Sequence, residues 1–262
     1  MSTLALNLNA RQRRAFGMLV ASEIRHAVRR PVGLIVAVGI PTVLLVIFGS
    51  IPGTTRPTQA LGGISFFNLY APTLLVFVLI AVGLTTLPQQ LSAYRQQGVL
   101  RRISTTPAHP SWLLAAQTTV NLILAVIGLG ILLGVGAVAY GMALPHDPGG
   151  YLVCFVALVL TAAATIALGL LVAAVAGSPQ IAQALTAVLF YPLAFFSGLY
   201  VPLQEIHSQV ITDISKVLPT GAGFNAVHAA FGGHSAGAEP LLVLAAWAIG
   251  GSLLAARLFR WE

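Results

Sequence analysis

Residues 111–139 read SWLLAAQTTVNLILAVIGLGILLGVGAVA and contain no Asp, Glu, Lys or Arg. A helix needs about 20 apolar residues to cross the hydrocarbon core of a bilayer, so this stretch is long enough to span a membrane. The chain holds five more stretches of this kind, of which only the last carries charges, close to its two ends. The six predicted spans are residues 32–51, 64–88, 111–139, 151–176, 180–200 and 238–259.

The composition of the chain agrees with this interpretation. Of its 262 residues, 57% are hydrophobic and 7% are charged. A soluble domain carries roughly 25% charged residues, because its surface must be solvated. A soluble enzyme and a nucleic-acid-binding domain are therefore excluded, and nucleic acid is not an expected partner. We predict an all-α membrane protein in which residues 1–262 form a single transmembrane domain.

The distribution of basic residues predicts the orientation in the membrane. Most of them lie before the first span, between the second and third spans, or at the end of the chain. Because basic residues accumulate in cytoplasmic segments, we expect a multi-pass protein of the cell membrane with both termini in the cytoplasm. The residues on this side are Arg11, Arg13, Arg14, Arg25, Arg29, Arg30, Arg95, Arg101, Arg102, Arg257 and Arg260, against Arg56 and Lys216 on the other.

Residues 11–30 have the pattern of an amphipathic helix that lies in the cytoplasmic interface. Its apolar face holds Phe16, Leu19, Val20, Ile24, Ala27 and Val28, and its opposite face holds arginines. Glu23 lies at the edge of the apolar face, near His26 and Arg30. Two interpretations of Glu23 remain open: a local ion pair, or a contact with a cytoplasmic partner.

The predicted cytoplasmic loop, residues 89–110, is too polar to cross a membrane. It reads QQLSAYRQQGVLRRISTTPAHP, with helix-forming residues first and a basic segment after Gly98. One interpretation is a loop that only anchors the topology. The other is a docking surface, because Val99, Leu100 and Ile103 lie among the arginines.

The segment between the fifth and sixth spans, residues 201–236, contains two short apolar stretches interrupted by proline and glycine. The first has a helical seam that consists of Leu203, Ile206, Val210, Ile214 and Val217. Each stretch is too short to be a span. We expect two short helices that lie at the outer interface or re-enter it.

Motifs for several kinds of chemistry are missing. The sequence has no phosphate-binding loop of the G-x-x-x-x-G-K-[ST] type, no H-E-x-x-H and no cysteine pair, so we predict neither ATP binding nor a metal site on this chain. Ser197 could serve an intramembrane enzyme, but it is more simply a packing residue at a helix end. No span carries a charge near its centre, so energy for uphill transport would have to come from another subunit.

Two local motifs resemble those of the type-2 permeases of ATP-binding-cassette exporters, the branch that exports drugs, lipids and polysaccharides. The family's cytoplasmic loop reads roughly E-R-E-x-G-T-L-x-x-L-x-x-T-P, and this chain matches it at Arg95, Gly98, Leu100, Thr106 and Pro107, with Ile103 for the second leucine. It departs from that pattern at Tyr94, Gln96 and Val99. The second motif is Ser197-Gly198 followed by Pro202 and later by Leu218-Pro219. The layout of spans resembles the family over nearly the whole chain.

This resemblance implies a permease that is not itself an enzyme and works with two ATPase subunits, which hold the ATP and Mg, and with a second permease chain, identical or homologous. The loop would be the coupling helix. The residues implied in ATPase contact are Tyr94, Arg95, Gln96, Gly98, Leu100, Arg101, Arg102, Thr106 and Pro107, with Glu23 from the interface helix. The second and fifth spans would line the pathway of a hydrophobic or amphipathic substrate, through Phe67, Tyr70, Phe77, Phe190, Tyr191, Phe195, Phe196 and Tyr200.

Alternatives to this export function remain. From the residues alone, tyrosines near span ends are equally typical of an interfacial belt. A scaffold or sensor that recruits a cytoplasmic protein through residues 89–110 without transporting anything is the alternative function.

Overall fold

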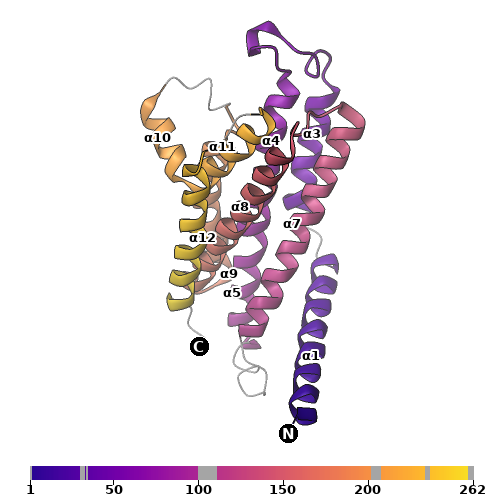
Figure 1. Cartoon of the computed structure of the whole chain (residues 1–262). Coiled ribbons are helices and arrows are strands. Elements are labelled where there is room, and N and C mark those ends of the chain that lie inside the picture. Colours follow the sequence, from indigo (N-terminus) through magenta and orange to yellow (C-terminus); the bar gives the residue numbers. More distant parts are fainter. Residues whose placement is uncertain are drawn as a thin grey trace.

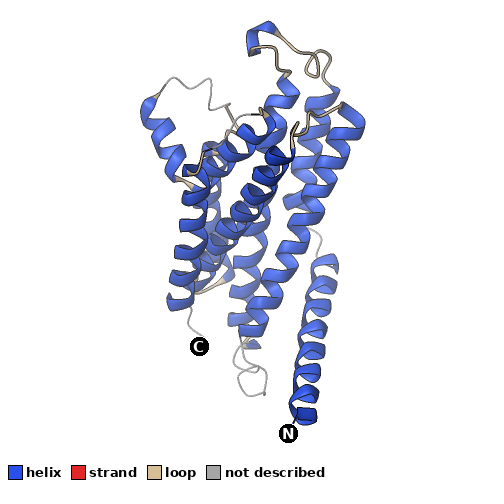
Figure 2. Cartoon of the chain, viewed as in Figure 1, coloured by secondary structure: helices blue, strands red, loops and turns tan. Residues whose placement is uncertain are grey.

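The computed structural model describes residues 2–29, 33, 35–99, 111–201, 208–233 and 237–258. Within these ranges every regular element is a helix and no strand occurs (Figure 2). The physical reason is that backbone groups in hydrocarbon have no water to bond, and a helix satisfies them within one segment. The predicted all-α class is thereby confirmed.

In the described part of the chain, five helices are long and apolar enough to cross a membrane. They are the continuous helix Phe66–Gln96, which comprises α4 (Phe66–Ala81), η3 (Val82–Thr86) and α5 (Leu87–Gln96), then α7 (Ser111–Tyr140), α8 (Pro148–Val175), α9 (Pro179–Phe196) and α12 (Glu239–Leu258). These helices and their apolar composition support a multi-pass membrane protein.

The first predicted span, residues 32–51, corresponds to a shorter apolar helix, Ile35–Ser50, made of η1 (Ile35–Gly39) and α3 (Ile40–Ser50). Its described part rises roughly 24 Å, against about 30 Å for the hydrocarbon core. Residues 31, 32 and 34 lie outside the described part of the chain. The number of six spans therefore stays a prediction.

Local sequence decides where two of the long helices begin. The side chain of Asp147 accepts a hydrogen bond from the Gly150 amide at 3.2 Å ahead of α8. The hydroxyl of Ser178 accepts one from the Ile181 amide at 3.3 Å ahead of α9. A proline follows each cap, where its missing amide hydrogen is not needed.

The span formed by α4 and η3 is the centre of the bundle. Every residue from Tyr70 to Leu84 is buried. Helices α3, α7, α8, α9 and α11 all contact α4 (Figure 1). A helix that is apolar on every side must be covered either by other helices or by lipid. Here the neighbouring helices cover it.

The middle of this central span is a π-helix, η3, and the sequence explains it. In an α-helix the carbonyl of Leu84 would accept a hydrogen bond from residue 88, but that residue is proline and has no amide hydrogen. The hydroxyl of Thr186, on α9, donates to the Leu84 carbonyl at 3.1 Å instead. A contact between helices thus replaces the missing bond within the helix.

Two glycines let η3 and α8 approach closely. A Cβ atom added at Gly169 would lie 2.1 Å from the carbonyl oxygen of Gly83. One added at Gly83 would lie 2.7 Å from the backbone of Thr165. Small residues at such a crossing allow backbones to meet directly, which is how membrane helices commonly pack.

The two short helices expected between the fifth and sixth spans are present as α10 (Gln209–Val217) and α11 (Pro219–Phe231). Helix α11 is buried against α8, α12 and α4. Helix α10 lies at the outer edge of the bundle (Figure 1), and the described part of the predicted apolar seam, Val210, Ile214 and Val217, is exposed. Leu203 and Ile206 lie outside the described residues.

The N-terminal helix, α1 (Ser2–Arg29), is longer than the predicted helix over residues 11–30. It contacts α7 and, in Figure 1, points along the length of the bundle instead of lying across its end. This direction differs from that of the flat interfacial helix the sequence predicts. The first residues of α1, the last residues of α12 and the turn after α5 all lie at the same end of the bundle (Figure 1).

Candidate functional site

The segment predicted to dock a partner begins as a direct continuation of the central span. Helix α5 extends from Leu87 to Gln96, so the first part of the predicted loop is helical and belongs to the 31-residue helix Phe66–Gln96. It ends in a turn at Gly98, whose φ of 68° lies in the left-handed region. Among the predicted contact residues, Leu100, Arg101, Arg102, Thr106 and Pro107 lie outside the described part.

The described contact residues differ in exposure. Gln96 is exposed, whereas Tyr94, Arg95 and Gly98 are half-buried. Arg95 reaches across to another helix: its Nη1 donates a hydrogen bond to the carbonyl of Ala176 at 3.2 Å. Since Ala176 directly follows α8, this bond joins the end of α5 to the end of α8.

Glu23 is buried, with 7% of its surface exposed, and its carboxylate faces α5 and α7. The hydroxyl of Tyr94 lies 3.0 Å from Oε1 and 2.9 Å from Oε2 and donates to the carboxylate. Nε2 of Gln117, a fully buried residue of α7, donates to Oε2. Glu23, Tyr94, Arg95 and Gln117 are called the junction residues below.

The local ion pair considered for Glu23 is not found among the described residues. His26 makes no salt bridge with it, and the His26 ring lies 6.5 Å from the ring of Tyr94. Arg30 lies outside the described part. The hydrogen-bonded partners, Tyr94 and Gln117, are far along the chain, and no local pattern around Glu23 points to them.

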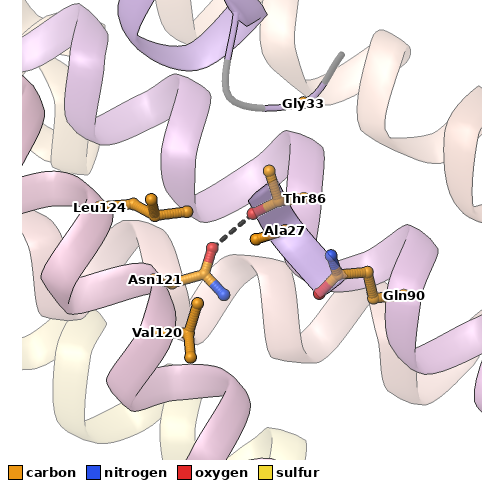
Figure 3. Close-up of a pocket in the computed structure, with 7 residues that line it drawn as sticks. All are labelled: Ala27, Gly33, Thr86, Gln90, Val120, Asn121 and Leu124. Carbon is orange, nitrogen blue, oxygen red and sulfur yellow. Dashed lines mark hydrogen bonds between the residues drawn. The ribbon is translucent and has the colours of Figure 1, made fainter. Parts of the chain in front are cut away.

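A small cavity of about 20 Å³ lies beside the junction residues, between α1, α7 and the central span. In Figure 3 the Thr86 hydroxyl donates to Oδ1 of Asn121. Nδ2 of Asn121 donates to the Gln117 carbonyl at 2.8 Å. This volume suits about one water molecule and is far too small for an organic substrate. Its lining consists of Ala27, Gly33, Thr86, Gln90, Val120, Asn121 and Leu124.

The predicted pathway aromatics do not form one cluster within the chain. Phe77 and Phe190, with ring centroids 5.7 Å apart, are the described pair that joins the second and fifth predicted spans. Phe67 and Tyr70 are buried, and their rings face Tyr140 and Phe48.

The remaining pathway aromatics belong to α9 and to the segment after it. Phe195 and Phe196 are half-buried and pack edge to face, whereas Tyr191 and Tyr200 are exposed. A pathway between two permease chains would be lined by such exposed groups. The pathway role stays a prediction.

Ser197 is fully buried, and its hydroxyl donates to the Ala194 carbonyl at 2.8 Å. This bond satisfies a backbone group in the last turn of α9. It favours the interpretation of Ser197 as a helix-end residue.

A family model described as ABC-2 type transporter matches residues 14–231. The match covers all of the junction residues, both local motifs and every predicted span except the last. A comparison with curated proteins finds no match.

Proposed function

The chain belongs to the ABC-2 type transporter family, and on that premise we propose that it is the membrane-spanning subunit of an ATP-driven exporter of a hydrophobic or amphipathic substrate. The family is one of non-catalytic permeases that work with ATPase subunits in a lipid bilayer. In our proposal two ATPase subunits bind ATP and Mg, and a second permease chain completes the transporter. Both termini face the cytoplasm.

One observation carries the proposal: the buried centre of the bundle and the first part of the segment predicted to dock the ATPase, residues 89–96, belong to one helix, Phe66–Gln96. Its outer half carries Phe67, Tyr70 and Phe77, and its inner end carries Tyr94 and Arg95. A push on the inner end would therefore act on the predicted pathway without passing through a flexible link.

The substrate class follows from the charges of the helices. Apart from Arg95, Glu239 and Arg257, which lie near helix ends, the described parts of the six apolar helices contain no charged residue. A charged substrate would need paired groups at membrane depth, because unpaired charges there are costly. The aromatic side chains of α4 and α9 suit the apolar surface of a drug-like or lipid-like molecule.

The test begins with purification of the chain from native membranes in a mild detergent, followed by intact-mass analysis. We expect an ATPase subunit with a phosphate-binding loop at one copy per permease chain. The isolated complex is then reconstituted into vesicles, and ATP-dependent movement of an amphipathic fluorescent dye is measured. The control is the double variant Gly98→Trp/Leu100→Asp, which should insert into the membrane but lose transport.

The proposal is overturned if the chain is stable and pure without any nucleotide-binding partner. That result would favour the scaffold or sensor function. It is also overturned if the complex forms and hydrolyses ATP but the double variant transports at the wild-type rate, because residues 89–110 would then not be the docking segment.

A further inference from the structure

The carboxylate of Glu23 is an unusual group to bury where α1 packs against the apolar helix α7. Among the described residues, no Arg, Lys or His nitrogen lies within salt-bridge distance of it. A buried carboxylate without a cation is strongly unfavourable unless hydrogen bonds replace its hydration. Tyr94 and Gln117 provide those bonds, from two different helices.

Simple anchoring of α1 does not require this arrangement. Ala27, one helical turn further along α1, is also buried and belongs to the main apolar core. An apolar side chain in place of Glu23 would extend that contact with α7 without the need to desolvate a charge. What the carboxylate adds is a directional bond to α5, which carries the segment predicted to dock the ATPase.

Two neighbouring residues of α5, Tyr94 and Arg95, form hydrogen bonds to different helices. Tyr94 bonds to α1 through Glu23, and Glu23 is bonded in turn to α7 through Gln117. Arg95 bonds to the carbonyl that follows α8. Hydrogen bonds therefore connect the last turn of α5 directly to α1 and to the end of α8, and indirectly, through Glu23, to α7.

We propose that Glu23 is a positioning residue for energy coupling: its carboxylate fixes α1 and α7 to the end of α5, so that the three helices move together when the ATPase displaces the docking segment. This inference rests on the proposed function and goes beyond it, since it assigns to Glu23 and Tyr94 a role inside the permease. Without the bonds, α5 moves alone and ATP hydrolysis no longer drives the bundle.

The functional test compares ATP hydrolysis with transport in the reconstituted complex. For Tyr94→Phe we expect the amount transported per ATP hydrolysed to fall by about tenfold or more, whatever the absolute rate of hydrolysis, because the step that joins the two is weakened. Tyr151→Phe is the matched control, since Tyr151 is an exposed residue of α8, and both rates should be unchanged. Wild-type transport by Tyr94→Phe would overturn the inference.

A reciprocal exchange separates the specific bond from general packing. Gln117→Glu places two carboxylates in contact and should abolish transport. Adding Glu23→Gln restores one carboxylate and one amide with their positions exchanged, and we expect transport to return to within about threefold of wild type, as coupled positions do. Failure of the exchange to restore transport, with both proteins folded and inserted, would also overturn the inference.

A third measurement uses the isolated complex in the absence of ATP. In a Cys154→Ala background, Ala27→Cys is buried between α1 and α7 and should react slowly with a maleimide. Gln117→Glu should raise its reaction rate by about tenfold or more as α1 separates, and the exchange should lower it again. Met18→Cys, at an exposed position of α1, should react at one rate throughout.

Together these measurements test the proposed function and the role of Glu23 separately. If the wild-type complex transports nothing but the labelling rates behave as expected, the proposed function is wrong, and the junction is only a structural contact. If transport is ATP-driven, but neither the labelling rate nor the transport rate changes in Gln117→Glu or in the exchange variant, the proposed function stands and the role of Glu23 is refuted.

Discussion

Replacement of Gly169 by alanine tests the packing that holds the central span against α8. The added Cβ would lie 2.1 Å from the carbonyl oxygen of Gly83, whereas unstrained carbon–oxygen contacts are about 3.3 Å or longer. The helices must therefore separate by about 1.2 Å at this point, because a backbone carbonyl cannot rotate away as a side chain can. The nearby contact between Gly83 and Thr165 would open with it.

The size of the effect follows from two opposing contributions. Overpacking of this kind costs roughly 3 kcal/mol, the upper part of the usual range, because the obstructing atom is backbone. Alanine gains about 1 kcal/mol over glycine in helix propensity. We therefore expect Gly169→Ala to lower the free energy of unfolding by about 2 kcal/mol, which corresponds to a fall of roughly 4–8 °C in the unfolding temperature.

The chain contains its own reporter for the assay. Cys154 is the single cysteine and lies buried in α8, on the same helix as Gly169. A maleimide that fluoresces on reaction with a thiol therefore reports unfolding as the protein in detergent is heated. The fluorescence midpoint is measured for wild type and for each variant.

Gly130→Ala is the matched control, because a Cβ at Gly130 on α7 would meet nothing within 4 Å. Its unfolding temperature should equal or slightly exceed that of wild type. If Gly169→Ala unfolds at the same temperature as Gly130→Ala, the close crossing of η3 and α8 is wrong.

Three further predictions follow from single contacts. Thr186→Val removes the donor to the Leu84 carbonyl and should lower stability by about 0.6–1.7 kcal/mol in the same assay, with Thr186→Ser close to wild type. Gly98→Ala should cost about 1–2 kcal/mol in the turn after α5, since φ is 68° there, and should lower ATP-driven transport while Gln97→Ala does not. Trp247→Phe loses the bond from Nε1 to the Val217 carbonyl at 2.8 Å, so trypsin should cut faster after the chain's single lysine, in α10. Unchanged cleavage would refute that anchoring role.

The end of the second span differs between the prediction and the structure. The sequence predicts a span that ends at Pro88 and, after it, a separate cytoplasmic loop that begins with helix-forming residues. In the structure the helix continues to Gln96. The chain adopts the π-helix η3 directly before the proline, and the Thr186 hydroxyl donates a hydrogen bond to the Leu84 carbonyl, which the proline cannot bond. The compensating group comes from α9, about 100 residues away in sequence, and no local pattern around Pro88 indicates it.

The N-terminal helix gives a second example. Its amphipathic pattern is visible in the sequence and correctly predicts a helix, but of the predicted apolar face Ala27 is buried whereas Ile24 and Val28 are exposed. The pattern does not say what covers that face, so an interfacial helix lying in the lipid surface was the natural expectation. In the structure Ala27 of that face and Glu23 at its edge are buried inside the protein, and the helix points along the bundle (Figure 1).

The sequence by itself determined the class of the protein, the positions of the long apolar helices and the family to which the chain belongs. These follow from local properties: a helix must be about 20 apolar residues long to cross hydrocarbon and must satisfy its own backbone. Only the tertiary structure decided that the carboxylate of Glu23 meets Tyr94 and Gln117, which lie 71 and 94 residues further along the chain. Such contacts depend on the rotation and register of packed helices, and those are set by the fit of whole surfaces such as the crossing of Gly83 with Gly169.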